Sequence, residues 1–218
     1  AGRLTTIPGY ITATSYNARG QVTSKSYASG ATLTNTYDPD RHWLTSTLVT
    51  DAIGATVFST IWTHNANGQI KTAETSDDAR DFDYSYDYVG RLLTALNRTN
   101  PSFDRVMSYD SAGSIASKSD LGAYTYPLVT ANNPHAPIQV GTHSFTYDAN
   151  GNMLTGLNGK VMTYDGENRP VSVSYQGDTT SYTYGPDGKR LIKDVTSSGQ
   201  TLFTGAIEVR DYGTANET

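Results

Sequence analysis

The densest group of side chains that could do chemistry is an acidic run near the middle of the chain. Four aspartates occupy the stretch 77–83, namely Asp77, Asp78, Asp81 and Asp83. Carboxylate oxygens are the ligands that calcium prefers. However, the run lacks the Asp-x-Asp-x-Asp-Gly loop of an EF-hand, and the chain has no Gly-Gly-x-Gly-x-Asp repeat. We therefore expect a solvated loop in which Arg80 pairs with a carboxylate, with calcium binding as the alternative.

The histidines and serines do not form a recognisable catalytic or zinc-binding pattern. No His-x-His or His-Glu-x-x-His spacing links the four dispersed histidines, which are His42, His64, His135 and His143. No Gly-x-Ser-x-Gly motif supports a serine nucleophile. Because the sequence has no cysteine, disulfides, thiolate metal sites and a catalytic thiol are excluded. We expect no metal and no cofactor.

An aspartate directly follows a tyrosine at several points along the chain, as in Tyr86-Asp87 and Tyr147-Asp148. Paired catalytic carboxylates need a fixed separation of about 5 to 10 Å and one member with a raised pKa. A single aspartate in each repeat instead suits a turn, where its side chain accepts a backbone N–H two residues on. An enzyme, such as one that cleaves polysaccharides, is the weakest of three hypotheses for this chain.

The element that carries each of these aspartates is a hairpin, seen most clearly in residues 145–153. Phe145 and Tyr147 alternate with Thr146, so both rings project from one face of a strand. Asp148 then begins a type I turn, and Gly151 supplies the positive φ of a G1-type bulge. The return strand begins near Met153.

Variants of this hairpin return along the whole chain, and most steps between copies are 20 to 23 residues long. The aromatic position of the copies is occupied by Tyr16, Tyr37, His64, Tyr86, Tyr109, Tyr147, Tyr164 and Tyr184. Asn168 replaces the bulge glycine of its copy, and asparagine tolerates positive φ best after glycine. Arg41 does not suit that position, so we expect a different turn after Tyr37.

The spacing predicts one all-β array over residues 1–218, with a longer loop around 127–143 that is not a domain boundary. Residues 1–5 resemble residues 89–93, so we expect the sequence to begin in the middle of a repeat. An array without caps leaves unpaired strands at its ends. We expect further repeats or another subunit to cover them.

Composition agrees with this interpretation and excludes other classes. Sixteen tyrosines, twenty glycines and 17% charged residues are typical of a β-rich chain with many turns. A net charge of −5 without a Lys/Arg run argues against nucleic-acid binding. No stretch approaches 18 apolar residues, and residues 1–10 do not resemble a signal peptide. We expect no membrane span, and any export signal must lie outside this sequence.

The Tyr-Asp-x-x-Gly copies resemble the Rhs/YD-repeat family of bacterial polymorphic toxins, of the C component of insecticidal toxin complexes and of the teneurin YD shell. The resemblance covers about the whole chain and is most specific in residues 133–137, 147–153, 164–169 and 188–190. It implies stacked hairpins that form a curved β-sheet strip, part of a hollow spiral shell. In toxin members of the family this shell encloses a C-terminal toxin.

The resemblance implies a non-enzymatic wall segment of a secreted or cell-surface shell. Its partners would be the remainder of a larger Rhs/YD polypeptide and its toxin cargo. The alternative is an extracellular scaffold or filament that binds glycans or cell-surface partners, or that self-associates through open sheet edges.

The aromatic side chains separate these two hypotheses. The pairs Tyr84/Tyr86, Tyr124/Tyr126 and Tyr182/Tyr184 alternate on one face, which predicts ring ladders between neighbouring repeats. The scaffold hypothesis instead needs exposed rings, and Trp43 and Trp62 are its candidates for holding a sugar. Two asparagines, Asn97 and Asn216, lie in sequons that would matter only in a eukaryotic secretory pathway.

Overall fold

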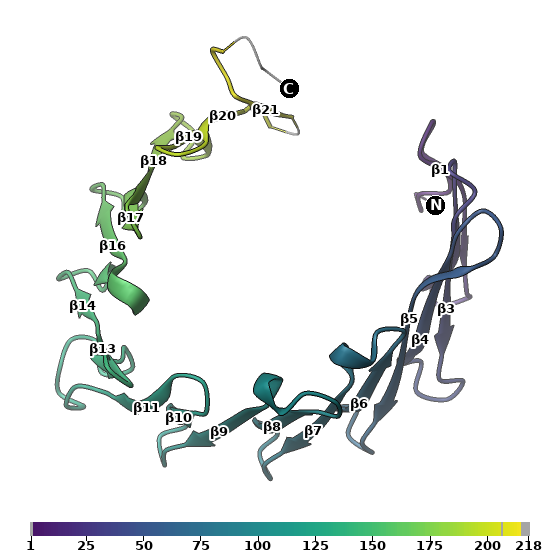
Figure 1. Ribbon diagram of the computed structural model, residues 1–218, viewed down its shortest axis with the longest axis horizontal. Helices are drawn as coiled ribbons and strands as arrows, with labels where there is room; N and C mark the ends of the chain where they lie inside the picture. The colour runs from purple at the N-terminus through teal and green to yellow at the C-terminus, as the bar shows by residue number, and fades with distance from the viewer. Residues whose placement is uncertain (1, 206, 215–218) are drawn as a thin grey trace. The chain divides into compact units, whose positions relative to one another are not determined.

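The computed structural model describes residues 2–205 and 207–214, without the side chain of Asp78. Asn216 lies outside the described residues. The chain divides into two units, Ala1–Ser108 and Tyr109–Thr218. The strands pair antiparallel with their neighbours in sequence except between β13 and β14, and Figure 1 shows the consecutive order. The chain is all-β, as the sequence predicts.

Unit 1 is a single sheet whose strand order follows the sequence. Its elements are β1 (Ile11–Tyr16), β2 (Val22–Tyr27), β3 (Thr32–Tyr37), β4 (Leu44–Thr50), β5 (Thr56–His64), β6 (Ile70–Thr75), the 3-10 turn η1 (Asp78–Arg80), β7 (Phe82–Tyr86), β8 (Leu92–Asn97), η2 (Pro101–Phe103) and β9 (Arg105–Tyr109), whose last residue belongs to unit 2.

Unit 2 contains two runs of strands, β10 to β13 and β14 to β21. Its elements are β10 (Ile115–Lys118), β11 (Gly122–Thr125), β12 (Gln139–Val140), β13 (His143–Ser144), β14 (Thr146–Tyr147), β15 (Met153–Thr155), η3 (Leu157–Gly159), β16 (Val161–Tyr164), β17 (Pro170–Tyr175), β18 (Asp178–Tyr184), β19 (Arg190–Val195), β20 (Gly199–Phe203) and β21 (Glu208–Arg210).

The turn between β14 and β15 has the geometry that its sequence predicts. The Gly151 N–H donates to the Asp148 carbonyl oxygen at 3.1 Å, and the Asp148 N–H donates to the Asn152 carbonyl oxygen at 2.9 Å. Gly151 has φ +88°, and the pairing register shifts between Thr146 and Tyr147, as in a G1 bulge. The Asp148 carboxylate accepts the N–H groups of Asn150 and Asn152 at 2.9 and 2.8 Å. The aspartate therefore stabilises its own turn.

Two substituted turns behave as expected. Asn168 takes φ +62° in place of a glycine. The turn after Tyr37 is of a different type because it is one residue longer. His42, rather than Arg41, takes positive φ at +61°, and its N–H donates to the Asp38 carbonyl oxygen at 2.9 Å.

A further turn of the same kind, which the Tyr-Asp pattern does not identify, lies between β4 and β5. Asp51 accepts the N–H groups of Ile53 and Ala55 at 3.0 and 2.8 Å, and Gly54 has φ +86°. Thr50 stands where the other copies have an aromatic residue, so this turn does not match the Tyr-Asp pattern. Its Asp-x-x-Gly spacing alone would have predicted the turn from the sequence.

The described residues of neither unit form a conventional hydrophobic core. The buried apolar side chains in the described part of the chain are Ala73, Val140 and Phe145. The 23.5 kDa chain exposes 13834 Å², whereas two compact globular units of half that mass would together expose about 11,800 Å². Each unit must therefore be stabilised mainly by contacts between adjacent strands and turns.

The loop in unit 2 runs from the end of β11 to the start of β12, so two short strands occupy the later part of the expected 127–143 segment. The division between the units falls at Ser108 and Tyr109, away from this loop. Among the residues that the structure describes, no helix has both the length and the apolar character of a membrane span.

Candidate functional site

Several motif tyrosines link their hairpin to the chain segment before it, whereas the Tyr164 hydroxyl contacts the Met162 sulfur of its own strand at 3.7 Å. The Tyr37 hydroxyl donates to the Val22 carbonyl oxygen at 2.9 Å, and Val22 is the first residue of β2. The same bond joins two other motif tyrosines to the first residue of the preceding return strand: Tyr86 to Ile70 at 2.8 Å and Tyr184 to Pro170 at 2.7 Å. Tyr126, which is not one of the regular copies, forms this bond with Ile115 at 3.0 Å. Tyr16 donates to the Leu4 carbonyl oxygen in the same manner at 2.5 Å.

These hydroxyl groups are already bonded within the protein. Burial raises the pKa of Tyr86, Tyr147 and Tyr184 above the usual tyrosine value, so the phenols stay neutral and act as donors. A hydroxyl that donates to a backbone carbonyl has no proton left to offer a sugar. The tyrosines therefore act as links between repeats.

A second link runs along the edge of the sheet, between successive turns. In three turns the residue that follows the positive-φ position forms a hydrogen bond with the positive-φ residue of the next turn, whereas Arg91 and Lys189 pair with an aspartate of their own turn. The Gln21 side-chain amide donates to the His42 carbonyl oxygen at 2.9 Å, and the Gln69 amide donates to the Gly90 carbonyl oxygen at 3.0 Å. The Asn152 amide reaches the Asn168 side-chain oxygen at 2.8 Å.

The same side chains occupy the space above the next glycine. A Cβ added at Gly68 would lie 2.9 Å from Trp43, and a Cβ added at Gly90 would lie 3.0 Å from Gln69. The Arg3 guanidinium covers Gly20 in the same manner. Glycine is thus required in these turns both for its positive φ and for the space that it leaves.

The loop before β12 replaces a missing turn in this series. The Asn133 side chain lies over Gly151, where an added Cβ would be 3.1 Å from the Asn133 oxygen. The Pro137 carbonyl oxygen accepts the Tyr147 hydroxyl at 2.9 Å. Residues 133–137 therefore make both contacts that a return strand makes elsewhere, which gives this family-like segment a structural role.

The described stacking of Tyr84 and Tyr124 is not the ladder between neighbouring repeats that the sequence predicts, because each ring stacks on a ring two residues away in the same segment. Tyr124 stacks with Tyr126, with ring centroids 6.4 Å apart, whereas Tyr84 stacks with Phe82 at 6.1 Å. Tyr182 and Tyr184 are covered by cations: Arg190 lies 5.8 Å from the Tyr182 ring, and Arg169 lies 4.8 Å from the Tyr184 ring. The sequence pattern identified the rings but did not reveal their arginine partners.

The two tryptophans are half-buried, and neither forms an open platform. Trp43 lies between Arg41, whose guanidinium is 4.9 Å from its ring, and His64, whose ring is 5.2 Å away. Trp62 pairs with Ala73 across β5 and β6. The most exposed aromatic side chain on a turn is instead Tyr88, at 96%.

The described carboxylates of the acidic run have separate partners. Asp77 pairs with Arg80 at 3.4 Å, as expected for the solvated loop. Asp81 accepts the Thr75 N–H at 2.6 Å. Asp83 pairs with Arg98 at 2.8 Å, which lowers the pKa of this carboxyl group.

Metal-binding side chains are not grouped in the part of the chain that the structure describes. It contains no cluster of three or more His, Asp or Glu side chains that could hold a metal ion. The Asp78 side chain lies outside this description. His143 accepts the Asn158 N–H at 3.4 Å, and His135 is exposed in the loop.

Asn97 has a structural role that its sequon does not suggest. Its side chain is 6% exposed, and its amide donates to the Ala79 carbonyl oxygen at 2.8 Å. Its side-chain oxygen accepts the N–H groups of Thr99 and Asn100 at 3.0 and 2.7 Å. In the folded chain this nitrogen is not available to carry a glycan.

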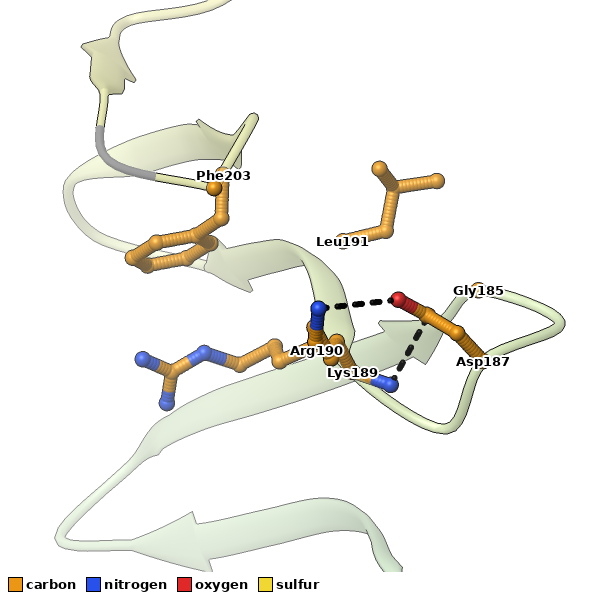
Figure 2. Close-up of a pocket in the computed structure, with 7 residues that line it drawn as sticks. Gly185, Asp187, Lys189, Arg190, Leu191 and Phe203 are labelled. Carbon is orange, nitrogen blue, oxygen red and sulfur yellow. Dashed lines mark hydrogen bonds and ion pairs between the residues drawn. The ribbon is translucent and has the colours of Figure 1, made fainter.

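A shallow cavity of about 310 Å³ lies where the series of turn-to-turn contacts is interrupted (Figure 2). Lys189 follows the positive-φ residue Gly188, but it pairs with Asp187 of its own turn at 3.4 Å. Arg190 points away from that pair and lies 4.3 Å from the Phe203 ring. The Lys189 and Asp187 charges compensate each other, which leaves the Arg190 guanidinium as the remaining charged group in the lining.

Comparison with solved structures identifies the fold. A crystal structure of TcdB2-TccC3 without its hypervariable C-terminal region matches 92% of the chain with a TM-score of 0.74 and 15% identity. The TcdB2-TccC3 crystal structure matches 94% with a TM-score of 0.72 and 15% identity. A Photorhabdus luminescens Tc holotoxin pore with a TccC3 mutation matches 92% with a TM-score of 0.70 and 16% identity.

The chain has the Rhs/YD-repeat fold. It spans 12%, 13% and 12% of the length of these three chains, respectively. No family model and no curated protein sequence matches the chain. At this level of identity the likeness is one of fold, in agreement with the Tyr-Asp-x-x-Gly copies and their regular links.

Proposed function

We propose that the chain is a non-enzymatic segment of the wall of a β-sheet shell that encloses a C-terminal toxin. The fold match over 92 to 94% of the chain to components of a toxin complex is the observation that carries this proposal. The absence of a conventional core supports it, because a wall is one strand layer thick. On this proposal the partners are the remainder of an Rhs/YD polypeptide and its toxin, and the protein is secreted or at the cell surface.

The mechanism that we propose is geometric. Neighbouring hairpins are joined by ladder hydrogen bonds and, in several copies, by a tyrosine hydroxyl or a turn-to-turn contact. Such nearest-neighbour links allow a sheet to extend by repetition. A wall of this kind would keep a partly unfolded cargo away from its host until delivery, and no residue of the wall would take part in a reaction.

The test uses the natural protein isolated from its source. We expect mass spectrometry to find a longer polypeptide with further repeats and a C-terminal domain. Under native conditions that domain should resist added protease, and it should be digested once the shell is unfolded. A C-terminal domain that is digested as readily in the native protein as after unfolding would overturn the proposal.

A matched pair of variants connects this protection to the wall. Tyr86→Phe removes a link between repeats, whereas Tyr88→Phe alters a side chain that is 96% exposed. We expect faster digestion of the cargo in Tyr86→Phe and an unchanged rate in Tyr88→Phe. Equal digestion rates in the two variants would show that protection of the cargo does not depend on the Tyr86 link.

The exposure of Tyr88 favours a second candidate, an extracellular scaffold that binds glycans or a cell-surface partner. Its turn position holds small or polar residues in most other copies, so the ring is exceptional there. Glycan-array binding that is lost in Tyr88→Ala and kept in Trp43→Ala would support this function. Concentration-dependent growth in sedimentation would support self-association through sheet edges.

A further inference from the structure

Three Asn-Gly sequences lie in turns of the described chain: Asn67-Gly68, Asn150-Gly151 and Asn158-Gly159. Asparagine is chemically labile. In an Asn-Gly pair the glycine amide nitrogen, after losing its proton, can attack the asparagine side-chain carbonyl carbon. A C–N bond forms, ammonia leaves, and a succinimide ring results. Water then opens the ring to aspartate or isoaspartate, so water is the only co-reactant.

Two of the three pairs are held by hydrogen bonds that oppose this attack. The Gly68 N–H donates to the Asn65 carbonyl oxygen at 3.0 Å, and the Asn67 amide donates to Gln69 at 2.8 Å. The Gly151 N–H donates at 3.1 Å within its turn, and the Asn150 amide donates to the Asn168 side-chain oxygen at 3.0 Å. In both pairs the nucleophile and the side chain that it must reach are restrained.

The third pair lacks these restraints. Asn158 and Gly159 are both exposed, with φ +60° and +77°. Neither the Asn158 side chain nor the Gly159 amide has a hydrogen-bond partner among the described residues. The turn that contains them is closed by a long 3.3 Å bond from the Lys160 N–H to the Leu157 carbonyl oxygen.

We infer that Asn158 is a site of spontaneous self-modification that converts to aspartate and isoaspartate in the folded protein well before Asn67 and Asn150. The product adds a carboxylate beside Lys160 and His143. Isoaspartate also lengthens the backbone by one carbon in the tight turn between β15 and β16. This inference does not depend on the proposed function.

The test is peptide mapping by mass spectrometry of the folded protein, aged at mildly alkaline pH. We expect Asn158 to convert at least about tenfold faster than Asn67 or Asn150, because each of those must break two hydrogen bonds. In urea, where the turns are unfolded, the three rates should converge. A rate at Asn67 or Asn150 equal to that at Asn158 in the folded protein would overturn the inference.

A matched variant tests the cause of the protection. Asn168→Gly removes the oxygen that holds the Asn150 amide, and glycine accepts the φ of +62° at this position. We expect conversion of Asn150 to accelerate about fivefold on the loss of one hydrogen bond, while Asn158 keeps its rate. An unchanged Asn150 rate, with circular dichroism showing a folded variant, would refute protection by the side-chain bond.

Discussion

Replacing glycine by alanine at two matched turns separates the two reasons why these turns need glycine. Gly54 and Gly68 lie in unit 1 at nearly the same φ, +86° and +89°. An added Cβ meets nothing within 4 Å at Gly54, whereas at Gly68 it lies 2.9 Å from Trp43. Gly54→Ala therefore measures the backbone cost alone, and Gly68→Ala adds the displacement of a half-buried indole.

The expected magnitudes follow from these contacts. An alanine at left-handed φ costs about 1 to 2 kcal/mol of unfolding free energy. Forcing a methyl group into an occupied site adds about 1 to 3 kcal/mol. We therefore expect Gly68→Ala to be less stable than Gly54→Ala by about 1 to 3 kcal/mol, as measured by urea unfolding at constant m-value.

A third substitution isolates the contact. In a Trp43→Ala background the indole is absent, so the additional cost of Gly68→Ala should fall to that of Gly54→Ala. The reasoning is refuted if Gly68→Ala and Gly54→Ala cost the same in the presence of Trp43. That result would mean that the indole does not hold its place over the glycine.

Four further predictions concern the tyrosines and one turn carboxylate. Tyr86→Phe should lower the free energy of unfolding by about 1 kcal/mol, whereas Tyr88→Phe should leave it unchanged, as measured by urea unfolding. Because burial raises the pKa of Tyr86, its contribution is complete below the unfolded pKa of about 10 and is lost as pH rises through the folded value. Tyr86→Phe should therefore reduce the alkaline loss of stability. The backbone hydrogen bond from Arg169 lowers the pKa of Asp165, so its contribution is complete above about pH 4 and is lost as pH falls through the lower folded value. Asp165→Asn should thus show a shallower acid loss in urea midpoints. Tyr147→Phe should increase hydrogen exchange in residues 126–138 and leave β18 unchanged.

Local chemistry is what made the hairpins predictable. Asp148 and Gly151 determine their turn by a side-chain acceptor and a positive φ, and both are properties of residue type. The same reasoning predicted positive φ at Asn168 and an irregular turn after Tyr37. The turn at Asp51 does not match the Tyr-Asp pattern because Thr50, and not an aromatic residue, precedes the aspartate.

The links between repeats could not be read from the sequence. The Tyr86 hydroxyl donates to the backbone carbonyl of Ile70. Because every residue has such a carbonyl, the amino-acid type at position 70 does not reveal the bond. Trp43 resembled an exposed sugar platform because its cover comes from Arg41 and from His64 of a later repeat. Such contacts depend on the lateral register of strands, which the alternation of residues along one strand does not determine.

The absence of a core makes these links more important than similar contacts in a globular protein. In a packed domain, the loss of one hydroxyl leaves most of the buried surface intact. Here each hairpin has few buried apolar side chains of its own, so its stability depends on the hairpin before it and the hairpin after it. The segment 133–137 shows how strict this dependence is. Where a regular turn is missing, Asn133 and Pro137 supply its two contacts to Gly151 and Tyr147, so the links continue across this interruption of the repeat.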